Sequence, residues 1–359
     1  MRFLHTTLPQ RVVFAPRASP RAVARETARL GARRVMLIAS RRAAALADPI
    51  AAGLPVVLRH EEVVMHVPAE VAERARAAAA HAGADAVVTV GGGSTTGLGK
   101  AVALTTGLPV VAVPTTYAGS EATNVWGLTE GGTKTTGTDD AVLPRAVVYD
   151  AALLTTLPAA LSVASGLNAL AHCVDSMWGP RADPIDRALA GEGIRALAAG
   201  LPAVAGNGGP AEGSRGADGL AGIEQTLYGA HLAAVAFASA GSGLHHRICH
   251  VLGGMFHLPH AQTHAVVLPH VLALNAPHAP EAERRLAAAF GAATAVQGLA
   301  ALRTAVDAPR ALRDHGMPAD GIARAVPAIL AAVPAGNPAP VTEENLTALL
   351  CAAWRGERR

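Results

Sequence analysis

The segment VVTVGGGSTTGLGKAVAL, residues 87–104, limits the possible folds of this chain more than any other part of it. A β-branched run leads into three glycines, Gly91, Gly92 and Gly93, and the residues after Ser94 have the composition of a helix. Glycines let backbone amides approach an anion closely, and a helix beginning near Ser94 would point its unpaired N–H groups at that anion. The pattern therefore predicts a phosphate-binding turn of a nucleotide site. Its spacing is neither G-x-G-x-x-G nor that of a Walker loop, and a glycine-rich turn without a ligand is the alternative.

The segments on either side of this turn alternate between strand-like and helix-like patterns. We expect strands at 11–16, 34–40, 85–90 and 107–116, and helices at 20–31 and 69–84. Strands that alternate with helices form a parallel sheet covered on both faces. Later in the chain, β-branched runs become rare and Ala- and Leu-rich helical patterns dominate. The sequence therefore predicts an α/β dinucleotide-binding domain at 1–155 and an all-helical domain at 156–359.

Composition argues against several classes of function. The net charge of +3 is small for 359 residues, aromatic residues make up 3%, and the arginines are scattered, so we expect no nucleic-acid partner. The chain has no long apolar run, and we expect no membrane partner. The N-terminal residues lack the apolar core of a signal peptide, and the three cysteines show no C-x-x-C spacing, which favours a cytoplasmic protein. The only lysines, Lys100 and Lys134, mark places where a compact ammonium is needed, or were kept by chance.

A second polar segment, VPTTYAGSEATN at 113–124, follows the next predicted strand and should lie at the same edge of the sheet. Its hydroxyl groups could reach a ribose, a nicotinamide amide or phosphate oxygens. The candidate cofactor-binding residues are Ser40, Gly91, Gly92, Gly93, Ser94, Thr95, Thr115, Thr116 and Ser120. The second strand ends in Ser40-Arg41-Arg42, without the acidic residue that would repel a 2′-phosphate. We therefore expect NADPH to be accepted alongside NADH, unless both arginines are ordinary surface residues.

Histidines are concentrated in GLHHRICHVLGGMFHLPHAQTH, residues 243–264. His246 and His250 are spaced i, i+4, as are Asn168 and His172 upstream, so each pair should project from one face of a helix. We expect Gly253 and Gly254 to end the first helix of this segment. Pro259 suits the start of the next, which places His260 near a helix N-terminus. Four polar side chains, those of Asn168, His172, His246 and His260, can therefore converge.

Four motifs, GGGSTTGLGK, VPTTYAGSE, SGLNALAHCVDSMW and GLHHRICHVLGGMFHLPHAQTH, resemble in this order those of the iron-containing (group III) alcohol dehydrogenase superfamily. The chain is most similar to its maleylacetate reductase branch. The resemblance implies an N-terminal dinucleotide-binding α/β domain, an all-helical C-terminal domain and an active site in the cleft between them. It also implies a homodimer.

Metal-dependent members of this superfamily hold a divalent ion through an Asp, a His four residues later and two further His. The resemblance places Asn168 at the Asp position and His172, His246 and His260 at the other three, with His250 lining the substrate site. An amide in place of the carboxylate leaves the ion with a weak neutral ligand, so we expect no resident metal. Three imidazoles can still hold zinc, which keeps the alternative open. Gly97 departs from the metal-dependent pattern too, because an Asp usually stands there.

The resemblance implies NADH- or NADPH-dependent reduction of the enone of maleylacetate, a small dicarboxylate, to 3-oxoadipate in the degradation of aromatic compounds. The candidate catalytic residues are His172, His246, His250, His260, Lys134 and Tyr117. We expect the imidazoles to bind the substrate carboxylates and polarise its ketone, with His250 as proton donor. Lys134 and Tyr117 would contact the substrate or hold the cofactor loop, and a surface or packing role is equally compatible with their positions.

The remaining histidines and cysteines of these motifs have simpler interpretations. They are His245, His257, His264, His270, Cys173 and Cys249, which we expect to be satisfied core or surface residues. Two other functions stay open. One is a metal-dependent alcohol or hydroxy-acid dehydrogenase in which Asn168 ligates through its amide oxygen. The other is a nucleotide-binding protein without catalytic activity.

Overall fold

The structure is a computed structural model, and it describes residues 2–131, 133–206 and 217–357. Its contacts divide it into two compact units: an N-terminal unit, Thr7–Leu157, and a helical unit formed by Met1–Thr6 and Pro158–Arg359. The sequence assigns residues 1–6 to the first domain, whereas the structure groups them with the helical unit. His5 explains this grouping, because its Nδ1 lies 2.8 Å from Oδ2 of Asp183 at the start of a helix.

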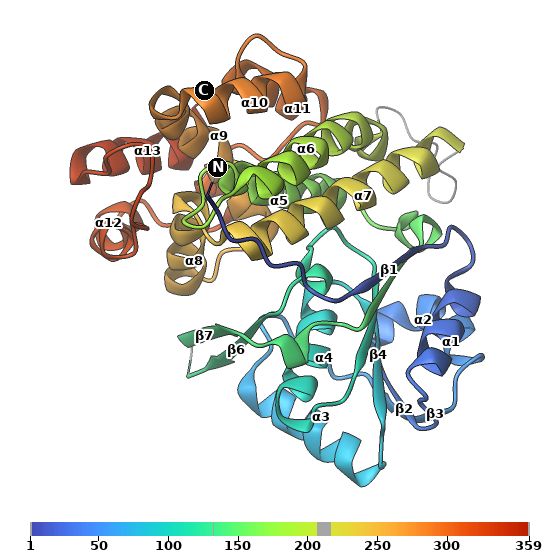
Figure 1. Ribbon diagram of the computed structural model, residues 1–359. Helices are drawn as coiled ribbons and strands as arrows, with labels where there is room; N and C mark the ends of the chain where they lie inside the picture. The colour runs from blue at the N-terminus through green and yellow to red at the C-terminus, as the bar shows by residue number, and fades with distance from the viewer. Residues whose placement is uncertain (1, 132, 207–216, 358–359) are drawn as a thin grey trace. The chain divides into compact units, whose positions relative to one another are not determined.

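A parallel sheet forms the centre of the N-terminal unit, with its strands in the order β1-β8-β5-β4-β2-β3 (Figure 1). These strands are β1 (Arg11–Phe14), β2 (Val35–Ile38), β3 (Val56–His60), β4 (Ala86–Gly91), β5 (Val110–Pro114) and β8 (Ala146–Tyr149). Between β5 and β8 the chain forms a separate antiparallel hairpin of β6 (Val125–Glu130) and β7 (Thr133–Thr138). Because all pairs in the main sheet are parallel, the carboxyl ends of its strands share one edge. That edge carries the glycine turn and both polar segments expected to hold the cofactor.

Both faces of this sheet are covered by helices. They are α1 (Ser19–Arg29), α2 (Ala44–Ala51), α3 (Ala69–His81) and α4 (Gly93–Thr106). Successive side chains on a strand point to opposite faces. Met36 and Ile38 of β2 pack in the core with α3 and α4, whereas Val35 and Leu37 pack in the core with α1 and α2 (Figure 1). The uninterrupted apolar runs of the sequence thus have a partner on each side, and the predicted α/β fold is confirmed.

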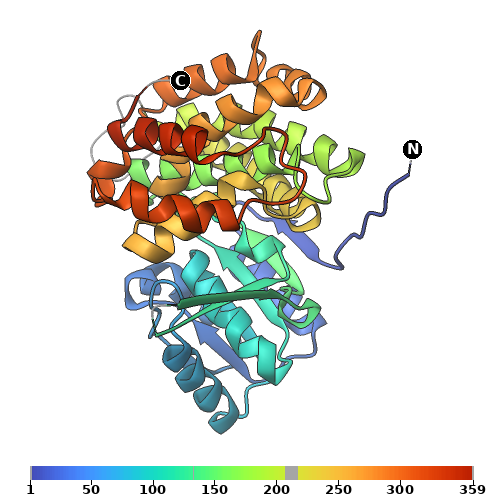
Figure 2. The same ribbon diagram turned by 90° about the vertical axis from the view of Figure 1, so that its left-hand side faces the viewer.

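The helical unit consists of packed helices. They are α5 (Ala159–Ser176), α6 (Pro184–Ala205), α7 (Ala217–Ala240), α8 (Leu244–Phe256), α9 (His260–Asn275), α10 (Pro280–Phe290), α11 (Ala295–Ala305), α12 (Gly321–Ala331) and α13 (Glu343–Arg355). Helix α5 is buried from Ser162 to Ser176, because α6, α7 and α9 pack against it. Helices α8, α9, α12 and α13 share one apolar core, and Figure 2 shows them in colours from gold to red.

Helices α6 and α7 approach each other closely through glycines. A Cβ atom on Gly200 would lie 2.7 Å from the carbonyl oxygen of Gly222, and one on Gly229 would lie 2.9 Å from the carbonyl oxygen of Gly193. Real Cβ atoms do not come this close to backbone, so any larger residue would force the helices apart. The glycines therefore set the spacing of this helix pair, which in turn packs against α5.

Helix α8, which carries three of the histidines, is longer than the sequence predicts. We expected α8 to end at Gly253 and Gly254, but it continues to Phe256, so that prediction was wrong. His257 closes the helix in the left-handed conformation, with φ of 52°. Glycine usually takes this role at a helix end, and here the chain uses a histidine instead. Helix α9 begins at His260, which confirms its predicted place at a helix N-terminus.

Two helical stretches of the described residues, Pro184–Ala205 and Pro280–Ala305, are long and apolar enough to cross a membrane by length and composition alone. The bent pair formed by α7 and α8 would count as a third. Helix α6 is packed against α5 and α7 and begins with a capping box formed by Asp183 and Asp186. The absence of a membrane partner stays a prediction.

Candidate functional site

The glycine turn lies between β4 and α4, as the sequence predicts, and its geometry excludes side chains. A Cβ atom on Gly91 would fall 2.3 Å from Oγ1 of Thr95, and one on Gly92 would fall 3.0 Å from Cγ2 of Thr116. Helix α4 begins at Gly93 with no side-chain cap, so its first N–H groups remain available to an anion. Bare backbone, an uncapped helix end and a strand edge fit the diphosphate of a dinucleotide.

The second polar segment lies beside this turn. The backbone N–H of Thr115 donates to the carbonyl of Gly91 at 3.0 Å, which joins the ends of β4 and β5. Thr115, Thr116 and Ser120 are half-buried, whereas Tyr117 is fully buried. The structure thus brings the threonines to the glycine turn, and contact of Tyr117 with a substrate stays a prediction. Lys134 lies in β7, and its side chain is outside the described part of the structure.

Lys100 joins α4 to the segment that follows the second loop. Its Nζ donates to the carbonyl oxygens of Thr123 and Val125, at 2.7 and 2.9 Å, and to Oγ1 of Thr123 at 3.1 Å. The side chain is fully buried, and burial lowers the pKa of Lys100 to about 7, against the charge of Glu121. Glu121 in turn accepts a hydrogen bond from the phenol of Tyr149 at 3.0 Å. Three hydrogen bonds converge on one buried nitrogen, which suits a compact ammonium and agrees with the idea that the rare lysine is needed here.

The predicted histidines meet in the helical unit. Helix α5 contributes His172, α8 contributes His246 and His250, and α9 contributes His260. The ring centroids of His172 and His246 are 4.9 Å apart, those of His246 and His250 are 6.1 Å apart, and those of His250 and His260 are 6.5 Å apart. His172 and His246 are buried, whereas His250 and His260 are exposed. We call these four residues, together with His245 and His264, the histidine cluster.

Asp175 is a buried carboxylate behind the cluster that sequence reasoning missed. Its Oδ2 accepts hydrogen bonds from Nδ1 of His246 at 2.7 Å and from the backbone N–H groups of Gly243 and His246 at 3.1 and 3.2 Å. Burial raises the pKa of Asp175 to about 7, and the backbone amides of His246 and Gly243 oppose that shift. With Nδ1 bonded to Asp175, His246 presents Nε2 to the cluster. The spacing of Asp175, three residues after His172 on one helix, was the available clue.

His245 and His264, which the sequence assigned to packing, belong to the cluster. Nε2 of His245 lies 2.9 Å from Nδ1 of His264, and both side chains are fully buried. The ring centroid of His264 lies 4.7 Å from that of His246 and 4.3 Å from that of His260. Its position one helical turn after His260 could have revealed it.

Among the described residues, several buried atoms of α5, α8 and α9 have no hydrogen-bond partner, and four of them belong to Asn168, His172, His246 and His264. These four are Oδ1 of Asn168, Nδ1 of His172, Nε2 of His246 and Nε2 of His264. Buried polar atoms are nearly always satisfied, so such a group of atoms indicates a place for a ligand. Three of the four belong to positions that the sequence predicted to converge.

Burial also sets the charge of the cluster. It lowers the pKa of His172 to about 4 and that of His245 to about 3, and it holds the pKa values of His246 and His264 well below their usual range. These rings are therefore neutral at neutral pH and offer hydrogen bonds rather than positive charge. A dianionic ligand would raise their pKa values, because a nearby negative charge favours the protonated ring.

The cluster fits a divalent metal only in part. His245, His246 and His264 offer nitrogen atoms within 4.8 Å of one another. However, the 2.9 Å between Nε2 of His245 and Nδ1 of His264 is a hydrogen bond, shorter than the roughly 3.3 Å between two nitrogen ligands on a tetrahedral zinc ion. Nε2 of His246 and Nε2 of His264 remain as ligand atoms, and the carboxylate of Asp175 is bonded to the far side of His246. A metal would have to be held by imidazoles, with the neutral amide of Asn168 as the other predicted ligand.

Comparison with known families assigns both parts of the chain. Residues 9–151 match the model of iron-containing alcohol dehydrogenase, and residues 162–354 match that of the Fe-containing alcohol dehydrogenase family, C-terminal. A maleylacetate reductase from Sphingobium indicum is 44% identical over 358 residues, which covers 99% of this chain and 98% of the relative.

Solved structures agree with this assignment. An iron-containing alcohol dehydrogenase from Corynebacterium glutamicum superposes with a TM-score of 0.95 and is 58% identical in sequence. The match covers 99% of this chain and 98% of that structure's chain. A maleylacetate reductase from Agrobacterium tumefaciens has a TM-score of 0.92 and 39% identity, and both chains are covered completely. The chain belongs to the iron-containing alcohol dehydrogenase family, in the branch formed by the maleylacetate reductases.

Proposed function

We propose that this protein reduces the carbon–carbon double bond of maleylacetate with NADH or NADPH, and that it needs no metal. The observation that carries the metal-free proposal is the 2.9 Å hydrogen bond between Nε2 of His245 and Nδ1 of His264, which is too short for two ligands of one ion. The neutral amide of Asn168, at a position that the resemblance assigns to a metal ligand, supports it too. Relatives named maleylacetate reductase support the substrate. The uncapped N-terminus of α4 and its glycine turn support the dinucleotide.

Bound NADH or NADPH would supply a hydride to the alkene carbon β to the ketone. Negative charge then develops on the ketone oxygen, where N–H groups of the neutral cluster rings and the amide nitrogen of Asn168 would donate hydrogen bonds to it. Nε2 of His246 is not among these donors, because the proton of that ring lies on Nδ1, facing Asp175. An amide suits this task better than an Asp, because a carboxylate cannot donate and would repel a dianionic substrate. A proton added to the α carbon completes 3-oxoadipate, so one hydride and one proton are consumed.

Asp175 and His246 act as a pair in this scheme. The carboxylate holds the ring proton on Nδ1 and fixes the ring, so that Nε2, which is buried without a partner among the described residues, is left as a hydrogen-bond acceptor. We regard Asp175 as a positioning residue. His250 keeps its predicted role as proton donor, and its exposure would let it exchange protons with solvent.

The proposal is tested by mixing the purified protein with NADH and maleylacetate and following NADH absorbance, with 3-oxoadipate identified by mass spectrometry. We expect turnover that depends on maleylacetate and falls by at least about 100-fold in His246→Ala. His278→Gln, which changes an exposed histidine of the same unit, should behave as the unchanged protein. No turnover with any maleylacetate preparation, in protein that binds NADH, would favour the alternative of a nucleotide-binding protein without catalysis.

The second candidate is a metal-dependent alcohol or hydroxy-acid dehydrogenase, which the imidazole trio His245, His246 and His264 supports. In that case His246 and His264 would hold the ion, which would act as a Lewis acid on a substrate oxygen. Elemental analysis of the purified protein, with activity measured before and after a chelator, separates the two. Stoichiometric zinc or iron whose removal abolishes turnover would refute the metal-free reaction.

We further propose a cytoplasmic homodimer without nucleic-acid or membrane partners, active in the breakdown of aromatic compounds. The edge strand β1 supports a dimer, since Val12 and Phe14 are 38% and 41% exposed on it. An edge strand presents unpaired backbone groups with which a second copy of the chain could pair. Light scattering coupled to gel filtration should report the mass of two chains; the mass of one chain would refute the homodimer.

A further inference from the structure

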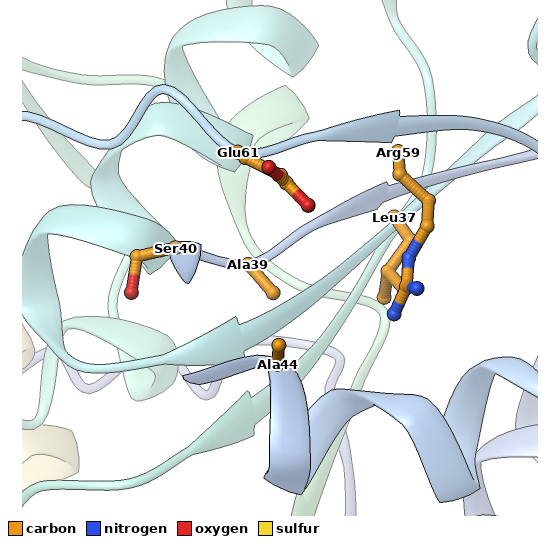
Figure 3. A pocket seen from close by; sticks show the side chains of 6 residues that line it. All are labelled: Leu37, Ala39, Ser40, Ala44, Arg59 and Glu61. Atoms are coloured by element: carbon orange, nitrogen blue, oxygen red, sulfur yellow. The ribbon is translucent and has the colours of Figure 1, made fainter. Parts of the chain in front are cut away.

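A small pocket lies at the carboxyl ends of β2 and β3 in the N-terminal unit. It is lined by Leu37, Ala39, Ser40, Ala44, Arg59 and Glu61 (Figure 3). Ser40 lies two residues after the end of β2, and Glu61 directly follows β3. The close-up shows the Glu61 side chain beside the segment that carries Ala39 and Ser40. Two neighbouring parallel strands thus supply a hydroxyl and a carboxylate to one hollow.

This pocket is placed to receive the adenosine half of a dinucleotide. In the sheet, β2 lies between β3 and β4, and Ile38 of β2 is paired with Thr89 of β4, two residues before Gly91. Neighbouring strands are about 4.8 Å apart, so the pocket begins one strand away from the glycine turn. In doubly wound folds a carboxylate at this edge accepts the ribose hydroxyls.

The sequence predicts no carboxylate at the end of the second strand, and in the structure the neighbouring strand β3 brings one to this place. Glu61 comes from β3, a strand that the sequence patterns did not predict. Its Oε2 accepts a hydrogen bond from Nε of Arg41 at 3.0 Å. This arginine is therefore ion-paired with Glu61, which competes with binding of a 2′-phosphate. Arg59, which also lines the pocket, is paired with Asp48. The charges that surround the pocket therefore largely cancel.

We propose that Glu61 recognises the ribose of the cofactor and makes the protein prefer NADH to NADPH. The inference rests on the proposed use of a nicotinamide cofactor, and it names the residue that determines which of NADH and NADPH binds more tightly. The Glu61 carboxylate accepts a hydrogen bond from the 2′-hydroxyl of NADH, whereas the 2′-phosphate of NADPH meets like charge. Arg41 limits this repulsion by partly neutralising Glu61.

The experiment measures the dissociation constants of NADH and NADPH by calorimetry, without substrate, so that catalysis plays no part. We expect the unchanged protein to bind NADH about 10-fold more tightly or better, and Glu61→Gln to bring the two constants within about three-fold. Arg41→Ala should widen the difference in favour of NADH. Glu62→Gln is the matched control, because Glu62 is equally exposed, pairs with Arg74 and does not line the pocket.

The outcomes separate this inference from the proposed function. If the unchanged protein binds both nucleotides equally, or if Glu61→Gln leaves their ratio unchanged, Glu61 does not set the preference. Tighter binding of NADPH would assign the decisive role to the arginines. If neither nucleotide binds, the proposed cofactor itself is wrong and the inference falls with it. Because Glu61 is 45% exposed, the variant should keep its circular dichroism and melting temperature.

Discussion

Replacing Asp175 by Asn tests whether the histidine cluster depends on the carboxylate behind it. Asn has nearly the same shape, and one amide oxygen can take the place of Oδ2. The backbone N–H groups of Gly243 and His246 would then keep an acceptor, at 3.1 and 3.2 Å in the unchanged protein. What is lost is the charge that strengthens the 2.7 Å contact with Nδ1 of His246.

The size of the effect follows from that contact. A hydrogen bond to a charged group contributes about 1.5–3 kcal/mol, which corresponds to roughly 10- to 150-fold in rate. We therefore expect kcat with maleylacetate to fall by about 10- to 100-fold. The dissociation constant of NADH should stay unchanged, because the glycine turn lies in the other unit. The NMR resonance of the His246 Nδ1–H should also move, as the tautomer is no longer fixed by a carboxylate.

Two further variants complete this test. Gly243→Ala should reproduce the loss, because a Cβ atom there would lie 2.5 Å from Oδ1 of Asp175. Asp186→Asn is the control, since Asp186 is an equally buried carboxylate of the same unit, in the capping box of α6. Folded Asp175→Asn protein with unchanged kcat would refute the positioning role, and an equal loss in Asp186→Asn would show a general effect on stability.

Three other predictions concern metal, packing and pH. Asn168→Asp should bind Zn²⁺ at least about 10-fold more tightly than the unchanged protein, seen as a larger rise of Tm with added zinc; equal affinities would mean that residue 168 does not face a metal position. Gly200→Ala should lower the stability of the helical unit by about 1–3 kcal/mol, because its Cβ would meet the carbonyl of Gly222. Gly191→Ala on the same helix, with nothing within 4 Å, should raise it by about 1 kcal/mol; similar melting curves would contradict this packing. Since the pKa of Lys100 is lowered to about 7 in the folded protein, the unfolded chain binds the extra proton above that pH. The free energy of unfolding should therefore rise by about 2 kcal/mol between about pH 7 and about pH 9, and Lys100→Met should lack this slope in urea titrations.

Local patterns predicted the main elements of the N-terminal unit because their causes are local. The strand ending at Gly91 and the helix beginning at Gly93 follow from a buried apolar run, glycines and a helical composition. Short elements were missed for the opposite reason. Helix α2 spans only Ala44–Ala51 and contains Pro49, and β3 carries Arg59 and His60. Their form is set by packing against β2, which no local pattern records, and with β3 unrecognised the role of Glu61 could not be predicted.

The candidate site was predictable where helical spacing alone brings residues together. Asn168 with His172, and His246 with His250, are each one turn apart, and Asn168, His172 and His246 each carry a buried atom without a hydrogen-bond partner among the described residues. The inner layer was not predicted. Asp175 reaches His246 from another helix, and the contact of His245 with His264 joins α8 to α9. Such contacts depend on how helices pack, and a sequence gives no distance between helices.

The ammonium of Lys100 couples two places that are far apart along the chain. It stands in the second turn of α4 and holds the chain at Thr123 and Val125, where the β6–β7 hairpin starts. A shift of the hairpin would therefore either move α4 with it or break the buried hydrogen bonds of Lys100. A dinucleotide that orders the first turn of α4 would therefore also restrain the base of the hairpin, because Lys100 links the two through hydrogen bonds.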